Sequence, residues 1–122
     1  MPATRVVFFQ DEDGQVPLLE WLDSLPKKPK AKCIARIQRL RDLGHEPRRP
    51  ETDLLRDGIY ELRVGFSGVN YRMLYFFHGQ TAAVVSHGCT KERIVPAREI
   101  ELAIQRKAKF AKAPERHTYE EA

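Results

Sequence analysis

The sequence predicts an α+β fold with the element order β-α-α-β-β-β-α, in which a small antiparallel sheet carries the two N-terminal helices on one face. Three features predict it: a short apolar run near the N-terminus, two segments with apolar residues at helical spacing, and a long stretch rich in strand-forming residues before a last amphipathic segment. With 122 residues, the chain has the length of one compact domain. We expect a single domain over residues 1–112 and a polar tail of residues 113–122 that frays.

The first half of the chain is expected to form one strand and two helices. Residues 5–9, RVVFF, are typical of a short buried strand. Pro17 suits the first turn of a helix that Pro26 ends, and the apolar residues between them fall at helical spacing: Leu18, Leu19, Trp21, Leu22 and Leu25. A second helix is expected over residues 29–43, with an apolar stripe of Cys33, Ile34, Ile37 and Leu40. Another face of this helix carries a basic stripe, most often solvated surface, of Lys32, Arg36 and Arg39.

The second half is expected to form three strands and a helix. Strand-forming residues fill 54–66, 69–78 and 81–90, and glycine-containing turns separate them, as in an antiparallel meander. Pro96 then opens a helix with acidic residues in its first turn and basic residues late, an order that complements the helix dipole. Its buried side is predicted to consist of Ile100, Ala103, Ile104 and Ala108.

The turns of this meander place two arginines side by side. A two- or four-residue loop around residues 67–68 sets Arg63 on one strand opposite Arg72 on the next. The same reasoning around residues 79–80 sets Arg72 opposite His87, whereas a three-residue loop would shift that register. We therefore predict a row of Arg63, Arg72 and His87 across three strands, with the last pairing dependent on the loop.

Alternation of side chains divides the predicted sheet into two faces. The face expected beneath the first two helices carries Tyr60, Leu62, Val64, Tyr71, Met73, Tyr75, Phe77, Ala82 and Val84. The opposite face is polar toward one end, with Glu61, Arg63, Asn70, Arg72, His87, Cys89 and Lys91. Its other end is apolar, with Ile59, Leu74, Phe76 and Val85. That apolar end requires a cover, either the last helix or a partner protein.

A row of basic groups requires a counterion, because like charges opposite each other destabilise a sheet. Glu61, on the same face, is one candidate. The net charge of +4 and the pI of about 9.2 favour an anionic partner, nucleic acid first. Two interpretations remain open: a solvated face balanced by Glu61 and Glu92, or a site for an RNA phosphate.

Cationic groups around a phosphate can also stabilise the added negative charge of a phosphoryl transition state. RNA supplies its own 2′-hydroxyl nucleophile, so a metal-free ribonuclease needs a general base, a general acid and charge-stabilising groups, and no cofactor. Glu61 and His87 are the candidate bases. Cys33 and Cys89 match no metal spacing, and no other cluster of metal ligands stands out. Without an apolar run long enough for a membrane span or a signal peptide, a cytoplasmic location is expected.

The segments YELRVGFSGVNYRMLYFF and AAVVSHGCTKERIVPAREIELA resemble the RelE/ParE toxin superfamily, in particular its phage-derived, HigB-like branch. The shared motifs are Tyr-x-Leu-Arg on one strand, Tyr-Arg-x-x-Tyr on the next, and a His-Gly-x-x-Lys-like segment before a proline-led helix. The resemblance covers residues 54–110 and implies a RelE-like fold. It also implies a type II toxin that cuts mRNA in the ribosomal decoding site without metal, leaving 2′,3′-cyclic phosphate and 5′-hydroxyl ends. The implied partner is a cognate antitoxin, expected to be a small helix-turn-helix protein.

Roles for individual residues follow from the same resemblance. Arg63 matches a basic residue of the RNA site, Arg72 the arginine that stabilises the transition state, and Lys91 the basic group after the last strand. Glu61 and His87 are weaker matches, and IVPAREI lacks the tyrosine that RelE places there, so the base and acid stay unassigned. Further RNA contacts are expected at Arg48, Arg49, Arg56 and Arg93. Two alternatives stay open: a ParE-like inhibitor of DNA gyrase, and a non-catalytic module that binds RNA or protein through the same fold.

Overall fold

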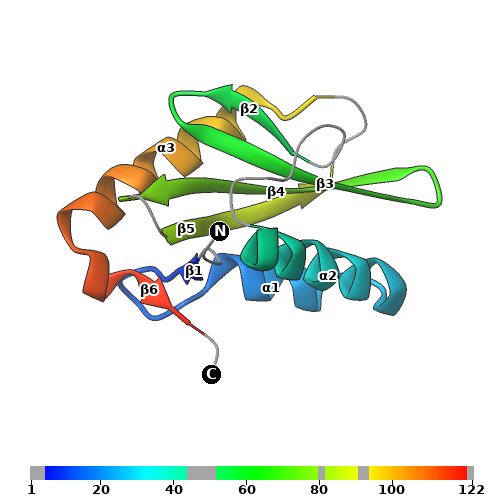
Figure 1. The fold of residues 1–122 in the computed structure, drawn as a ribbon, viewed down its shortest axis with the longest axis horizontal. Coiled ribbons are helices and arrows are strands. Elements are labelled where there is room, and N and C mark those ends of the chain that lie inside the picture. The colour runs from blue at the N-terminus through cyan, green and yellow to red at the C-terminus, as the bar shows by residue number, and fades with distance from the viewer. Residues whose placement is uncertain (1–4, 44–51, 80–81, 91–93, 121–122) are drawn as a thin grey trace.

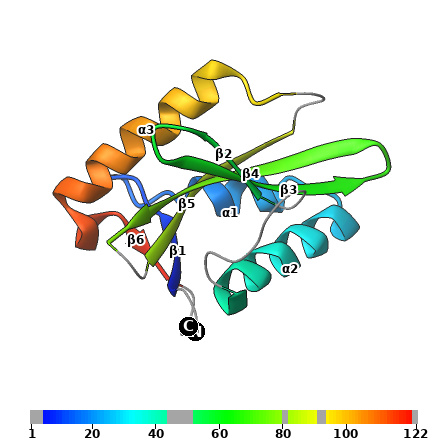
Figure 2. The same cartoon turned by 45° about the horizontal axis from the view of Figure 1, so that its top comes forward.

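A computed structural model describes residues 5–43, 52–79, 82–90 and 94–120 of the chain, which form a mixed α+β fold. In chain order the elements are β1 (Arg5–Phe9), α1 (Pro17–Asp23), α2 (Lys27–Leu43), β2 (Thr52–Arg56), β3 (Ile59–Phe66), β4 (Val69–His78), β5 (Ala82–Thr90), α3 (Ala97–Lys112), a 3-10 turn (Pro114–Arg116) and β6 (Thr118–Tyr119). The strands form one open sheet, with α1 and α2 on one side of it and α3 on the other (Figures 1 and 2). Within the described ranges, no helix has the length and apolar character that a bilayer crossing requires.

The sheet is mixed, whereas the sequence predicted a purely antiparallel one. Its strand order is β2-β3-β4-β5-β1-β6, and β1 pairs parallel with β5. An interior strand has neighbours on both sides and is covered on both faces, and four consecutive residues of β1 are buried: Val6, Val7, Phe8 and Phe9. The apolar run RVVFF therefore indicated burial correctly. It carried no information about which strand β1 joins or in which direction.

The strand predicted over residues 54–66 is two strands. β2 and β3 form a hairpin whose turn, Asp57-Gly58, has positive φ angles of 52° and 78°. Two consecutive positive φ angles are typical of the tight hairpin turns that favour the Asp-Gly dipeptide. The Asp57-Gly58 turn could have been predicted from the sequence. Because strand-forming residues lie on both sides of it, the segment was predicted as one continuous strand.

The polar tail, which we expected to fray, is structured over most of its length. After the 3-10 turn, β6 pairs with β1, which places Tyr119 opposite Phe8. His117 is buried: its Nδ1 donates to the carbonyl of Gln10 at 2.7 Å, and its ring stacks on Phe9 with centroids 4.9 Å apart. These contacts are made with residues over a hundred positions earlier in the chain. The local sequence therefore could not predict that the tail is structured.

Two hydrophobic clusters lie on opposite faces of the sheet. The cluster beneath α1 and α2 includes Val6, Phe8, Leu18, Leu22, Cys33, Ile37, Leu40, Leu62, Val64, Tyr71, Met73, Tyr75, Ala83 and Val85. The cluster beneath α3 includes Val7, Phe9, Ile59, Leu74, Phe76, Val84, Cys89, Val95, Ala103 and Phe110. The apolar end of the second face is thus covered by α3, which was one of the two covers expected. Val84 and Val85 occupy the faces opposite to those predicted, and Ala108 is exposed where burial was predicted.

Val84 and Val85 occupy faces opposite to those predicted because β4 and β5 pair in a different register. His78 pairs with Ala82, so the connection holds three residues, the case that shifts the register. A β-bulge then follows, because Leu74 pairs with His87 while Tyr75 pairs with Val85, which leaves Ser86 as the extra residue. Together these irregularities set Cys89, not His87, opposite Arg72, and the predicted pairing of Arg72 with His87 is wrong.

Gly88 marks a close approach between β5 and α1. A Cβ atom at this position would lie 2.1 to 2.5 Å from carbons of the Trp21 ring. Gly88→Ala is therefore expected to lower the free energy of unfolding by about 1–3 kcal/mol, because the ring must move to relieve the clash. Urea unfolding measures this. Gly65→Ala on β3 is the matched control, since a Cβ there has no atom within 4 Å. Equal stability of the two variants would contradict the close packing.

Candidate active site

The predicted arginine pair is present in the sheet. Arg63 on β3 is paired directly with Arg72 on β4, as the turn at residues 67–68 indicated. Arg72 is buried, with 7% of its surface exposed, and Arg63 is half-buried. Cys89 of β5 lies opposite Arg72, so the row across the three strands is Arg63, Arg72 and Cys89. The row lies on the sheet face that α3 covers at its apolar end, because Cys89 belongs to the cluster beneath that helix.

Glu61 supplies the counterion for this pair. It precedes Arg63 by two residues on β3 and therefore lies on the same face. Its Oε1 is 3.5 Å from Nη1 of Arg72, and both side chains are less than 10% exposed, at 5% and 8%. Burial raises the pKa of Glu61, the charges of Arg72 and Arg63 oppose this, and Asp53, its cross-strand neighbour on β2, adds to the rise. A carboxyl group shifted in this direction is suited to accept a proton near neutral pH.

Two buried polar atoms on β3 lack a hydrogen bond within the described part of the chain: Oε1 of Glu61 and Nε of Arg63. Buried polar atoms are nearly always hydrogen-bonded in folded proteins, so such exceptions require an explanation. One acceptor and one donor lie here on neighbouring residues of a single strand. The arrangement fits a polar ligand that forms hydrogen bonds with both atoms.

His87 lies in a different environment, beneath α3. Its Nδ1 is 2.8 Å from Oγ of Ser86, and its Nε2 is 2.9 Å from Oε1 of Glu99. Burial lowers the pKa of His87, the hydrogen bond to Glu99 opposes this, and the charge of Arg106 adds to the lowering. The neutral ring then donates from Nε2 to the carboxylate and accepts from Ser86 at Nδ1. Both ring nitrogens are engaged within the protein, and the register places His87 diagonal to Arg72.

Arg106 completes the network around His87. Its Nη1 donates to Oγ of Ser86 at 3.3 Å, its Nη2 is 3.9 Å from the carboxylate of Asp11, and its guanidinium lies over the ring of Phe9 at 5.5 Å. The network joins α3 to β5 and to the loop after β1. Ser86 contributes to it because the β-bulge turns its side chain toward α3. Nothing in the local sequence pairs Ser86 with Arg106, so this network was not foreseen.

The depressed pKa of His87 predicts a pH-dependent stability. Its folded-state pKa lies below the unfolded value of about 6.5, so the neutral ring stabilises the fold fully above that pH, and this contribution is lost as the pH falls toward the folded-state pKa. In His87→Gln the amide still donates to Glu99 but does not titrate. The stability advantage of wild type over this variant should shrink by on the order of 1 kcal/mol between pH 7 and pH 5, as measured by urea unfolding. A constant difference would contradict a neutral His87.

The remaining predicted site residues divide into two groups. Arg56 is exposed and forms ion pairs with Asp57 at 2.9 Å and with Glu101 of α3 at 2.5 Å, so its charge is balanced within the protein. Four others lie outside the described residues: Arg48, Arg49, Lys91 and Arg93. In the part of the chain that the structure describes, no group of three or more His, Cys, Asp or Glu side chains is arranged to hold a metal ion.

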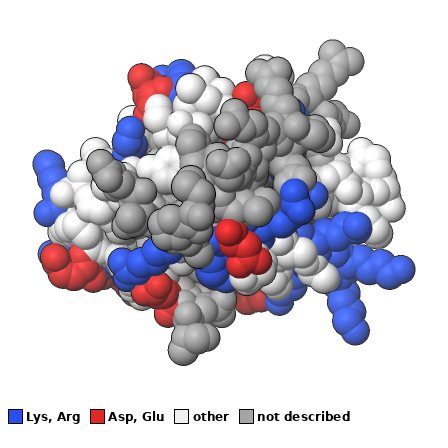
Figure 3. Space-filling view, viewed as in Figure 1, with Lys and Arg blue, Asp and Glu red and all other residues white. Residues whose placement is uncertain are grey.

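A basic surface on α2 adjoins the arginine pair. The helix carries seven lysines and arginines and one acid: Lys27, Lys28, Lys30, Lys32, Arg36, Arg39, Arg41 and Asp42. Basic side chains gather on the side of the molecule where α2 lies (Figure 3). Arg36 donates to the backbone carbonyl of Arg63, on a part of β3 that extends past its pairing with β2, and Lys32 lies 5.8 Å from the ring of Phe66. The predicted basic stripe thus reaches the strand that carries Arg63.

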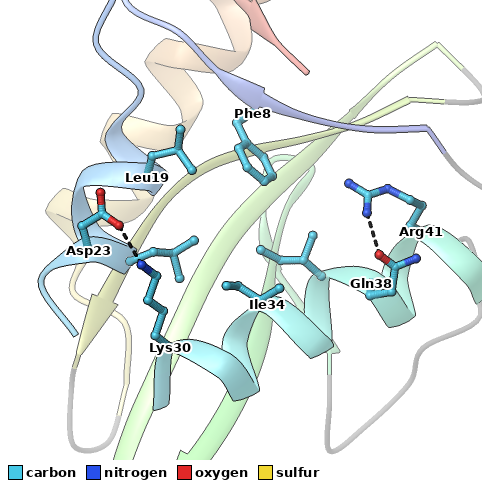
Figure 4. A pocket seen from close by; sticks show the side chains of 9 residues that line it. Phe8, Leu19, Asp23, Lys30, Ile34, Gln38 and Arg41 are labelled. Carbon is cyan, nitrogen blue, oxygen red and sulfur yellow. Dashed lines mark hydrogen bonds and ion pairs between the residues drawn. The ribbon is translucent and has the colours of Figure 1, made fainter. Parts of the chain in front are cut away.

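A separate pocket of about 270 Å³ lies between α1, α2 and β1 (Figure 4). Phe8, Leu19 and Ile34 line it, and Lys30 forms an ion pair with Asp23 across its edge at 2.8 Å. Ile34 was predicted to be buried, and 48% of its surface is exposed because it faces this pocket. The pocket lies on the α1–α2 side of the sheet, so it is separate from the arginine pair.

The sequence over most of these elements matches a known family of proteins. Residues 20–108 match the family described as Phage derived protein Gp49-like (DUF891), and the chain belongs to this family. The family is one of toxins of toxin–antitoxin systems and belongs to the RelE/HigB-like superfamily. The matched range includes α2, Glu61, the two arginines and His87. No curated protein matched the chain.

Proposed function

We propose that this protein is the toxin of a type II toxin–antitoxin pair, of the HigB-like branch, that cleaves mRNA in the ribosomal decoding site without a metal ion. The observation that carries the proposal is the cross-strand pair of the half-buried Arg63 and the buried Arg72, with Glu61 on the same sheet face. Two guanidinium groups beside a carboxyl group of raised pKa supply the charge stabilisation and the base that cleavage by the 2′-hydroxyl requires.

The proposed reaction is an internal transesterification of the RNA. The 2′-oxygen forms a bond to phosphorus while the bond from phosphorus to the 5′-oxygen breaks, which gives a 2′,3′-cyclic phosphate and a 5′-hydroxyl end. Glu61 accepts the proton of the 2′-hydroxyl, and Arg63 and Arg72 stabilise the negative charge on the phosphoryl oxygens. The proton on the leaving 5′-oxygen is assigned to Lys91, the basic group after β5 in the motif. His87 is assigned a positioning role, because Ser86 and Glu99 occupy its ring nitrogens.

The proposed partners follow from the family and the charge. The antitoxin is proposed to be a small helix-turn-helix protein of the cytoplasm. Its expected site no longer includes the apolar end of the second face, because α3 covers those residues. RNA is proposed to contact the basic surface of α2 and four further arginines: Arg48, Arg49, Arg56 and Arg93.

A reconstituted translation assay tests the proposal. Purified protein is added to ribosomes paused on a defined mRNA, and primer extension maps the new 5′ ends. Cleavage within the decoding-site codon, with 5′-hydroxyl ends that resist ligation until they are phosphorylated, is the expected result. Intact mRNA together with inhibited DNA supercoiling would instead support the gyrase inhibitor. Binding of RNA without cleavage would support the non-catalytic module.

A further inference from the structure

We propose that an anion bound between Arg63 and Arg72 displaces Glu61 as the counterion of Arg72, and that the displaced carboxylate takes up one proton. The site would then couple phosphodiester binding to protonation. This inference deepens the proposed function, on which it rests for the identity of the anion as an RNA phosphodiester. Its test requires neither the ribosome nor cleavage.

The geometry makes Glu61 a replaceable partner. Its contact with Arg72 is 3.5 Å long, and the same oxygen, Oε1, has no hydrogen bond in the described chain. A strong arginine–carboxylate pair has shorter, hydrogen-bonded contacts, typically 2.7–2.9 Å. Nε of Arg63, two residues along the strand, is likewise a buried donor without a hydrogen bond. A phosphodiester has two non-bridging oxygens and can accept from both arginines at once, which the carboxylate of Glu61 does not do here.

The surroundings of Glu61 explain why it would take up a proton when Arg72 turns to the anion. Among the described residues, the charged groups that act on its carboxyl are Arg72, Arg63 and Asp53, and of these the two arginines favour the charged form. An anion engages both of these and adds a negative charge beside the carboxylate. Glu61 would then face that charge and Asp53 in a buried setting, where an unpaired carboxylate is costly.

Other charged groups nearby are committed elsewhere. From α3, Glu99 faces His87, Glu101 faces Arg56, and Lys107 donates to the backbone carbonyl of Asp57. From β5, His87 is held neutral between Ser86 and Glu99. None of these contacts reaches Glu61, so within the described part of the chain the charges that act on its carboxyl are those of the two arginines and Asp53, to which a bound anion would add.

The coupling has a mechanistic consequence. In the proposed sequence of events, Glu61 is ionised before binding and neutralises Arg72. Once the phosphodiester occupies the arginines, the same carboxylate becomes a stronger base at the moment when the 2′-hydroxyl arrives. With RNA the proton comes from that hydroxyl, and with an anion that lacks it the proton comes from solvent. Binding energy at the phosphate thereby activates the base.

Calorimetry with a 2′-O-methyl RNA trinucleotide tests the inference, because this probe presents the phosphodiesters but has no nucleophile. Titrations of the purified chain in two buffers that differ in ionisation enthalpy give the number of protons taken up on binding. Wild type should take up close to one proton at neutral pH, and its affinity should fall by up to about tenfold for each unit of rising pH. Glu61→Gln should bind more tightly than wild type, with no proton uptake and no pH dependence.

Glu12→Gln is the matched control, since Glu12 is an exposed carboxylate whose partner is Lys109, and it should behave as wild type. Arg63→Ala should abolish binding of the trinucleotide. Binding of the trinucleotide to wild type without proton uptake would overturn the inference. This measurement uses the wild-type protein alone, so it does not depend on whether any variant folds. Absence of binding, or binding that survives Arg63→Ala, would also overturn it. The proposed nuclease can fail independently, by leaving mRNA intact on the ribosome while the proton-linked binding is present.

Discussion

Replacing Arg72 by alanine is expected to reduce the rate of mRNA cleavage on paused ribosomes by about 10²- to 10³-fold, the loss typical when one group that stabilises transition-state charge is removed. Arg72 is the more buried member of the pair, and a charge in a water-poor setting acts more strongly than one in solvent. The measurement is a single-turnover cleavage rate with ribosomes in excess. Arg72→Lys should recover only part of the loss, because an ammonium group lacks the planar fork of a guanidinium group.

Arg98→Ala is the matched control for this prediction. Arg98 lies on α3 with 73% of its side chain exposed, and its removal should leave the cleavage rate unchanged. Circular dichroism and urea unfolding of Arg72→Lys establish that the fold is intact before rates are compared. Full activity in a folded Arg72 variant would remove Arg72 from the proposed reaction.

Glu61→Ala is expected to lower the free energy of unfolding by about 3–5 kcal/mol, the cost of removing one partner of a buried ion pair. The substitution leaves Arg63 and Arg72 adjacent to each other without the carboxylate that offsets their repulsion. Urea unfolding at neutral pH measures the loss. The double variant Glu61→Ala/Arg72→Ala should lose less stability than the sum of the two single variants, because the coupled pair is removed as a unit. Strict additivity of the two substitutions would show that the contact between them contributes nothing to stability.

The parts of the fold that the sequence predicted correctly are those set by local patterns. The RVVFF strand, the helix opened by Pro17 and the helix after Pro96 each begin where apolar spacing and proline placed them. The pairing of Arg63 with Arg72 was also predictable, because one short turn fixes that register. Glu61 follows directly from it, two residues away on the same strand face.

The errors concern contacts between distant segments. The parallel pairing of β1 with β5 and the antiparallel pairing of β6 with β1 join residues that lie far apart in the chain, so no short window of sequence encodes their relative positions. The predicted pairing of His87 with Arg72 was wrong for a different reason. A loop of three residues and a bulge at Ser86 each shift the pairing of β5 with β4 by one position. Once shifted, His87 meets Glu99 of α3, twelve residues later, and the tertiary packing of that helix determines its chemistry.

The bulge at Ser86 also bears on how such a site can change over evolutionary time. Val84 and His87 face the same side with Ser86 between them, so a strand one residue shorter would keep both on that side in an uninterrupted ladder. The sheet itself therefore does not need Ser86. Its hydroxyl group serves His87 and Arg106, and the loss of a single codon would remove that link while leaving Cys89 opposite Arg72. In this family an insertion or deletion in β5, and not only a substitution, could alter the polar support beneath α3.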